Sequence, residues 1–164
     1  MKVPTPSTGS GTATGRDKER PPRSSYVAWD HATLRWADID VYGHMNNARY
    51  FELIDTVVND QLARQVGTDI RALPAVGLVA EVSCRYFAEI TYPGSLDLGI
   101  YVERLGTSSV VYRVGIFQGD PGAEGALAAA EGRFVHVYVD NTDPSRPVTP
   151  MPPEVRAALE PLVV

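Results

Sequence analysis

The segment from Asp38 to Tyr50 concentrates side chains that could do chemistry. It reads D-I-D-V-Y-G-H-M-N-N-A-R-Y and so brings together acids, a histidine and two asparagines. A strand predicted from Val27 to Trp36 leads into it, and a helix predicted from Asn46 to Gln65 leads out. At such a strand-to-helix junction several backbone N–H groups lack partners and point the same way. A carboxylate beside these donors suits acyl chemistry, because the donors polarise a carbonyl while the acid activates water or attacks directly.

The full spacing D-x-D-x-x-G-H-x-N-N-x-x-Y, followed by an amphipathic helix, resembles the hotdog-fold acyl-CoA thioesterases of the 4-hydroxybenzoyl-CoA thioesterase-like family. The resemblance covers roughly Tyr26 to Pro150, counting the order of elements as well as the motif. A motif of this length at a strand–helix boundary is specific. The resemblance implies a thioester hydrolase that releases a free acid and coenzyme A, with the acyl-CoA as substrate and no cofactor.

The resemblance implies that Asp40 is the catalytic carboxylate, acting either as general base or as nucleophile. The alternative from the residues alone is a turn or capping role, since Asp is common before helices. A backbone N–H near Asn47 is implied to bind the thioester oxygen, with the helix dipole stabilising the oxyanion. His44 either orients the loop or helps to position the thioester or the water, and Asp38 is predicted to shape the turn.

Gly43, Met45, Asn46 and Tyr50 are the predicted substrate-binding residues within the motif. Gly43 permits a backbone geometry or a close substrate approach that a side chain would forbid. The alternative for Asn46 is a role as helix N-cap. The alternative for Tyr50 is packing in the core, because it belongs to an apolar stripe at helical spacing.

Further candidates lie outside the motif. The resemblance implies contacts with the pantetheine or the nucleotide for Arg85, Tyr86 and Ser108, the last in a predicted hairpin from Arg104 to Ser109. The alternative is that these are ordinary surface residues, because exposed Arg and Ser side chains need no functional explanation. Glu52 and Asp55 are rivals to Asp40, because some hotdog thioesterases carry their carboxylate on the central helix.

The fold class predicted from the pattern is α+β, with one long early helix followed by a meander of strands. The predicted strands after the helix are Val76–Ile90, Leu96–Leu105, Ser109–Gln118 and Ala126–Asp140. The resemblance implies the hotdog arrangement, an antiparallel sheet wrapped around one central helix. The residues alone do not distinguish it from other one-helix α+β folds.

Three segments organise the chain. Residues 1–25 are rich in Pro, Ser, Thr and Gly, and we predict a disordered tail. Residues 26–150 form the predicted hotdog domain. Residues 151–164 form a C-terminal segment in which Glu154–Leu162 could be a short helix.

Bulk composition narrows the function classes. The 164 residues carry a net charge of −5 while the N-terminal 25 are net basic, so the domain is acidic and nucleic-acid binding is not expected. No apolar run is long enough to span a membrane, and the N-terminus does not read as a secretory signal. The single cysteine, Cys84, fits a reducing cytoplasm and is read as a small buried hydrophobe.

Other site types find no support in the pattern. No cluster has metal-ligand spacing, no dinucleotide or phosphate loop occurs, and no serine-hydrolase elbow is present. His136, between Phe134 and Tyr138 on one predicted strand face, reads as a satisfied structural histidine, and His31 belongs to no recognisable constellation.

Three functional hypotheses remain. The first is a cytoplasmic acyl-CoA thioesterase, which the resemblance implies to be a homodimer or a tetramer of dimers with sites at the subunit interface. The second is a hotdog hydratase or dehydratase, and the third a non-catalytic acyl-CoA-binding hotdog protein.

Overall fold

A single antiparallel sheet dominates the computed structural model, which describes residues 20–120, 122–123 and 125–164. Its strand order is β1-β3-β4-β5-β2, so β1 and β2 form the two edges. The strands are β1 (Ala28–Thr33), β2 (Ala75–Tyr86), β3 (Ser95–Leu105), β4 (Ser109–Gln118) and β5 (Ala130–Asp140). Consecutive strands β3, β4 and β5 pair as a meander, whereas β1 and β2 join it from either side.

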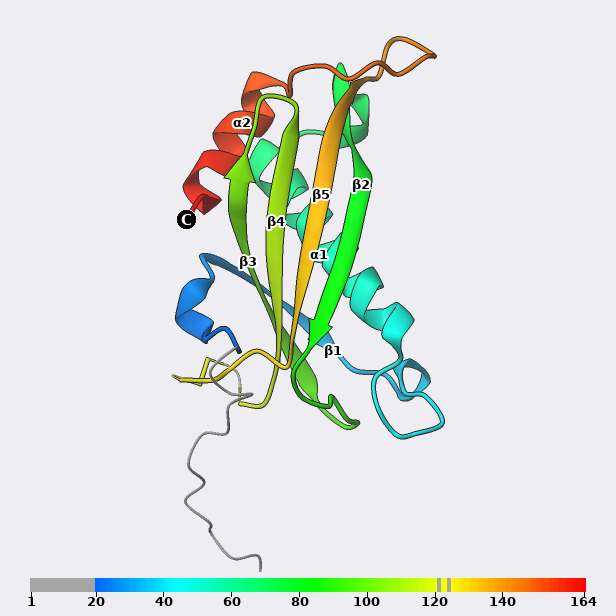
Figure 1. Ribbon diagram of the computed structural model, residues 1–164, viewed down its shortest axis with the longest axis vertical. Helices are drawn as coiled ribbons and strands as arrows, with labels where there is room; N and C mark the ends of the chain where they lie inside the picture. Colours follow the sequence, from blue (N-terminus) through cyan, green and yellow to red (C-terminus); the bar gives the residue numbers. More distant parts are fainter. Residues whose placement is uncertain (1–19, 121, 124) are drawn as a thin grey trace, which may run out of the picture.

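The long helix α1 (Asn47–Val66) lies against one face of this sheet, behind the strands in Figure 1. The Asn46 side chain caps its N-terminus by accepting from Ala48 N at 2.9 Å, and Gly67 ends it in the left-handed conformation with φ 71°. One face of the helix is buried: Tyr50, Leu53, Ile54, Val57, Val58, Gln61 and Leu62. The predicted helix, Asn46–Gln65, therefore differs by one residue at each end.

Close approach of helix and sheet depends on Gly132 in β5. A Cβ atom at this position would collide with the Ile54 side chain, which is fully buried at the centre of the core. The absence of a side chain at 132 thus lets α1 sit directly on the sheet.

Some strand ends differ from the predicted bounds. The first strand stops at Thr33, because Trp36–Asp38 form a 3-10 turn (η3) in which the Asp38 carboxylate accepts from Arg35 N at 2.8 Å. At the other edge, β2 ends at Tyr86 rather than Ile90, and β5 begins at Ala130 rather than Ala126.

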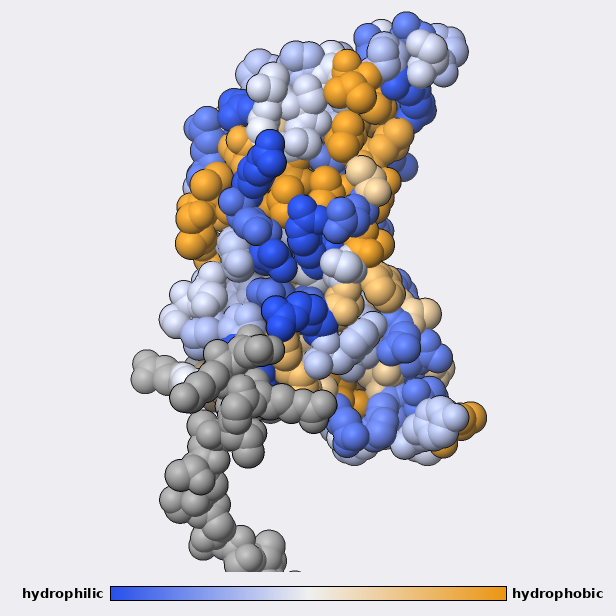
Figure 2. Space-filling view, in the orientation of Figure 1, coloured by the Kyte–Doolittle hydropathy of each residue, from blue (hydrophilic) through white to orange (hydrophobic). Residues whose placement is uncertain are grey.

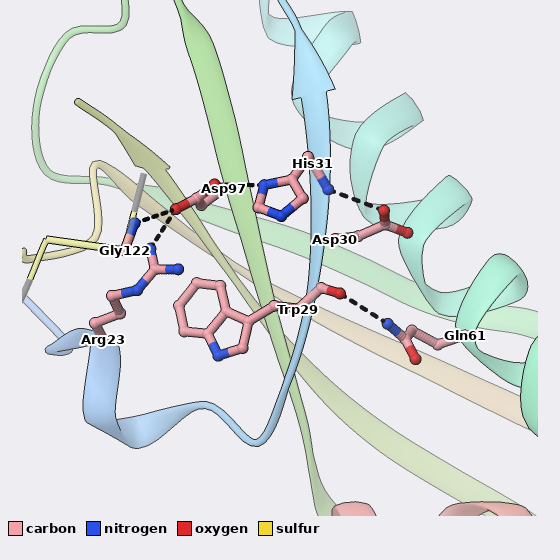
Figure 3. A network of polar contacts seen from close by, with 7 residues as sticks. All are labelled: Arg23, Trp29, Asp30, His31, Gln61, Asp97 and Gly122. Atoms are coloured by element: carbon pink, nitrogen blue, oxygen red, sulfur yellow. Dashed lines mark hydrogen bonds and ion pairs between the residues drawn. The ribbon is translucent and has the colours of Figure 1, made fainter. Parts of the chain in front are cut away.

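Residues 20–25, which the sequence assigned to a disordered tail, pack against the domain. Arg23–Ser25 form a 3-10 turn (η2), and the Arg23 guanidinium contacts Asp97 of β3 (Figure 3). Tyr26 then lies across Gly99 and Gly115, where any Cβ would meet its ring. Residues 1–19 of the predicted tail lie outside the described residues.

The C-terminal segment contains α2 (Pro153–Leu159), at the position of the predicted short helix, followed by a 3-10 turn η5 (Glu160–Leu162). Val155 and Leu159 are buried where α2 contacts α1 and β3. The last residues reach back to the sheet, where Val163 bridges Val102.

The outer face of the sheet, opposite α1, is chemically divided. Figure 2 shows hydrophilic side chains across its middle and apolar surface above them. The charged part contains the ion pairs Arg113–Glu103 at 2.5 Å and Arg133–Glu81 at 2.5 Å. The architecture is the hotdog fold, in the α+β class. No helix in the part of the chain that the structure describes is long and apolar enough to cross a membrane.

Candidate active site

The loop of residues 38–46, here called the junction loop, connects η3 to α1. Asp38 is nearly inaccessible, and its carboxylate binds the Arg35 side chain with a shortest distance of 2.6 Å. These donors hold the pKa of Asp38 below its usual range, with the Arg35 hydrogen bond as the largest cause. Its carbonyl accepts from Asn46 N at 2.8 Å and closes the base of the loop. Asp38 thus has the turn-shaping role expected from the sequence.

Asp40 is held by the backbone of the same loop. Its Oδ1 accepts from Tyr42 N at 2.8 Å and from His44 N at 3.2 Å, and its own N–H donates to His44 O at 2.9 Å. Gly43 closes the turn with φ 83°, a conformation that favours glycine. Among the described residues, no hydrogen bond engages Oδ2, so one carboxylate oxygen is fixed and the other is available.

Asp40 lines a cavity of about 280 Å³ between the start of α1 and the end of β2. The lining residues are Asp40, His44, Met45, Asn47, Tyr50, Tyr86, Phe87, Ala88 and Glu89. The Tyr50 and Tyr86 rings meet edge to face with centroids 4.9 Å apart and form an aromatic wall. Burial raises the pKa of Tyr50 to about 12, so it is a neutral hydroxyl at physiological pH.

The N-terminus of α1 supplies the hydrogen-bond donors. The Asn46 side chain takes the Ala48 N–H, and the Asn46 carbonyl takes the Arg49 N–H at 2.9 Å. Within the described residues, no hydrogen bond engages the Asn47 N–H, and Asn47 lines the cavity. This donor lies at the positive end of the dipole of a helix of 20 residues.

The segment after β2 completes the cavity through long-range contacts. Met45 N donates to Ile90 O at 2.8 Å, and His44 forms a bridge with Thr91. His44 Nε2 also lies 3.3 Å from a Glu89 carboxylate oxygen. Sequence reasoning missed Phe87, Ala88 and Glu89, because nothing in their local pattern marks them as neighbours of a loop so far away in the chain.

Six of the predicted site residues therefore line one cavity: Asp40, His44, Met45, Asn47, Tyr50 and Tyr86. Gly43 and Asn46 act on the same loop through conformation and capping, and do not line the cavity. Arg85 is exposed beside Tyr86, with its guanidinium 5.3 Å from the Phe87 ring centroid.

Ser108 does not reach this cavity. It lies in the turn between β3 and β4, where its carbonyl accepts from Tyr138 N at 2.8 Å, at the opposite end of the sheet from the junction loop (Figure 1). The chain thus does not bring Ser108 to Asp40, because the hairpin points away from the start of α1.

The rival carboxylates also lie elsewhere. Glu52 is exposed and pairs with Arg49 at 2.6 Å, whereas Asp55 is exposed and accepts from Asn59. Neither lines the cavity. Among the described residues, no group of His, Cys, Asp and Glu side chains could hold a metal ion. Burial raises the pKa of Cys84 to about 11, which makes this half-buried thiol a poor nucleophile.

Residues 34–159 match the family described as the thioesterase-like superfamily. The crystal structure of the PA5185 protein from Pseudomonas aeruginosa strain PAO1 is similar with 40% identity and a TM-score of 0.79, covering 88% of this chain and 96% of that one. The PA2801 protein from Pseudomonas aeruginosa is 28% identical with a TM-score of 0.68, covering 81% of this chain and 98% of that one.

A more distant structure shares the fold. The BH1999 gentisyl-coenzyme A thioesterase is 18% identical with a TM-score of 0.66, covering 80% of this chain and 99% of that one. No protein of curated function matches the sequence. Because the family match spans most of the chain, including the whole junction loop and α1, the protein belongs to the thioesterase-like superfamily.

Proposed function

We propose that this protein hydrolyses acyl-coenzyme A thioesters, with Asp40 as the reacting carboxylate. The observation that carries the proposal is the position of Asp40, whose Oδ1 is fixed by two backbone N–H groups in the cavity that Asn47 also lines. A carboxylate and an N–H donor that line the same small cavity suit the two demands of acyl transfer, attack on the carbonyl carbon and stabilisation of its oxygen.

In the reaction, the thioester carbonyl oxygen accepts from the Asn47 N–H, where the α1 dipole stabilises the negative charge that develops. Asp40 either removes a proton from a water that attacks the carbonyl carbon, or attacks the carbon itself to give an anhydride that water then opens. In both routes the C–S bond breaks, the thiolate of coenzyme A takes up a proton, and the free acid is released.

Other residues have supporting roles in this proposal. His44, beside Glu89, positions the junction loop and the water, while Tyr50 and Tyr86 flank the thioester. Arg85 is exposed next to Tyr86 and supplies positive charge for the phosphates of the coenzyme A. This local charge matters because the protein as a whole is acidic.

The proposed assembly is a homodimer that pairs through β2, or a tetramer of such dimers. β2 is an end strand of the sheet, and it exposes apolar side chains that a lone edge strand ordinarily avoids: Leu78, Val79, Val82 and Tyr86. In an antiparallel pair of β2 strands, Tyr86 of one protomer lies toward the partner's Ala75 end. The cavity beside Tyr86 would then border the dimer interface. We also propose that the enzyme acts in the cytoplasm.

The deciding experiment measures thiol release from a panel of short, long and aromatic acyl-CoAs by the wild type, Asp40→Asn and Asp55→Asn. We expect hydrolysis of at least one substrate by the wild type and a loss of about 10²- to 10⁴-fold in kcat/KM for Asp40→Asn with its fold intact. Asp55→Asn is the matched control, because it removes an exposed helix carboxylate outside the cavity, and it should keep wild-type activity.

Other outcomes would contradict parts of the proposal. Equal hydrolysis by the wild type and Asp40→Asn would place the reacting carboxylate elsewhere. Tight acyl-CoA binding without turnover of any chain length would instead support a non-catalytic binding protein, and formation of a hydration product would support a hydratase.

A further inference from the structure

A second cavity lies at the other end of α1. It has a volume of about 140 Å³ and is formed by the second half of α1, the 3-10 turn η4 (Ile70–Ala72), the start of β2, the end of β5 and α2. Its lining residues are Asn59, Leu62, Ile70, Arg71, Leu73, Ala75, Val76, Gly77, His136, Tyr138 and Val155. None of them lines the candidate active site.

His136 makes this cavity chemically unusual. Only 2% of the residue is accessible, yet its Nδ1 has no hydrogen-bond partner among the described residues. A Cβ on Gly77, which also lines the cavity, would lie 2.9 Å from Nδ1. The absence of a side chain at Gly77 therefore lets the Nδ1 edge of the ring pack closely against the β2 backbone. The prediction of a satisfied structural histidine is wrong in this respect, because the ring is buried but one nitrogen is unpaired.

Tyr138 adds a second buried polar atom. Its hydroxyl lies close enough to that of Tyr112 for the two to shift each other's pKa as side-chain hydrogen-bond partners do, although neither meets full hydrogen-bond geometry with any described residue. An unpaired buried polar group costs about 1–3 kcal/mol, so the Nδ1 atom of His136 in particular needs a partner. Burial lowers the pKa of His136 to about 4, so at neutral pH the ring is uncharged and can donate or accept.

The remainder of the lining is apolar. Leu62, Leu73 and Val155 are each at most 8% accessible and form the walls beneath Asn59 and Arg71. Arg71 is already paired with Asp69 at 2.8 Å, so its charge is compensated. A cavity with apolar walls, neutral polar atoms and a compensated charge does not favour an anion or a cation. It favours a small neutral molecule with one polar group.

We propose that this cavity binds a small neutral molecule whose apolar ring or chain packs against Leu62, Leu73 and Val155, while its hydroxyl or carbonyl group hydrogen-bonds His136 or Tyr138. The volume fits a single ring, because an apolar cavity of about 150 Å³ accommodates benzene. The site is distinct from the Asp40 cavity and independent of thioester hydrolysis.

Phenol and toluene are the matched probes, since they have similar shape and differ in a hydroxyl. Binding is followed on the full-length protein by two-dimensional amide and imidazole NMR, which reports both the affinity and the residues affected. We expect phenol to bind about 2- to 10-fold more tightly than toluene, with shifts at Asn59, Gly77 and His136. The Asp40→Asn variant should bind phenol as the wild type does.

Two variants test the polar groups without changing the ring volume greatly. The variants are His136→Phe and Tyr138→Phe. At least one of them should still bind toluene but no longer prefer phenol over toluene. The native amide spectrum of each variant shows whether it is folded. Absence of phenol binding, equal affinity for the two probes in the wild type, or shifts confined to Tyr50 and Tyr86 would each overturn the proposal.

Discussion

Arg49 Nε lies 3.5 Å from Asp38 Oδ2, so the first turn of α1 is tied to the start of the junction loop. Asp38 also receives the Arg35 side chain, and Arg49 continues to Glu52 at 2.6 Å. Asp40 stands between these anchored points, two residues after Asp38 and seven residues before Asn47, the first residue of α1. Its position relative to the Asn47 N–H therefore depends on a carboxylate that takes no part in the proposed reaction.

The first prediction concerns Asp38→Asn. Loss of the charge-assisted bonds should lower the free energy of unfolding by about 1–3 kcal/mol and reduce hydrolysis by displacing Asp40. The pKa of Asp38 is lower in the folded than in the unfolded protein, so its stabilisation is complete above about pH 4 and is lost as the pH falls through the folded pKa. Urea unfolding should therefore show a gap between wild type and variant at pH 7 that closes under acid. Asp60→Asn, an exposed helix position, should show no gap at pH 7.

Gly43 offers a test of backbone conformation. Its φ of 83° strains an L-residue, whereas a Cβ there would meet no atom within 4 Å. Gly43→Ala should thus cost about 1–2 kcal/mol through conformation alone and reduce kcat/KM, and Gly43→Asn should cost less, because Asn tolerates the left-handed region. Thermal unfolding and thiol-release assays on both variants check this. Equal effects of Ala and Asn would point to a steric cause instead.

The third prediction concerns the edge strand β2. Val82→Lys places a charge among the exposed apolar side chains of this strand, where Val82 is 38% accessible. If β2 strands pair, the variant should be monomeric by light scattering and have much lower hydrolytic activity. Val164→Lys, an exposed apolar residue at the C-terminus, should leave assembly unchanged. A stable wild-type monomer with full activity would contradict a site at the interface.

Asp97 holds residues 20–26 on the outer face of the sheet. Although burial opposes its ionisation, Gly122 N, Arg23 and His31 hold the pKa of this carboxyl below its usual range. The His31 Nδ1–Asp97 Oδ1 distance is 2.6 Å, and Arg23 also lies over the Trp29 ring (Figure 3). Asp97→Asn should therefore accelerate trypsin cleavage after Arg23 by about 10-fold or more, as followed by mass spectrometry. The control Asp30→Asn removes the exposed Arg64 pair and should leave that rate unchanged.

What the sequence could predict was local. The bounds of α1 follow from the Asn46 cap, the Gly67 stop and an apolar stripe, and all three lie within the helix and its ends. The strands were predicted in the same way, from the local alternation of apolar and polar residues. The motif also located most of the candidate site, because Asp40, His44, Asn47 and Tyr50 are close in the chain as well as in space.

What escaped prediction depends on contacts between distant residues. Glu89 reaches His44 only because Met45 pairs with Ile90, and His31 meets Asp97 only because β1 pairs with β3. The sequence pattern therefore gave no partner for His31. For His136, the pattern indicated burial, but whether its ring nitrogens find partners depends on side chains from β2 and β4 that the pattern does not place.

The last prediction follows from the burial of His136. Its pKa falls to about 4 in the folded protein, whereas an unfolded chain titrates near 6.5. Below about pH 6.5 the unfolded state binds a proton that the folded state does not, so stability falls by about 1.4 kcal/mol per pH unit until the folded pKa is reached, roughly 3 kcal/mol in total. His136→Phe removes this proton uptake, so its stability relative to the wild type should rise steadily from pH 7 to pH 4.5 in urea unfolding. His44→Gln replaces a far more exposed histidine and should not reproduce that rise. A pH-independent difference between His136→Phe and the wild type would mean that folding does not lower the pKa of His136.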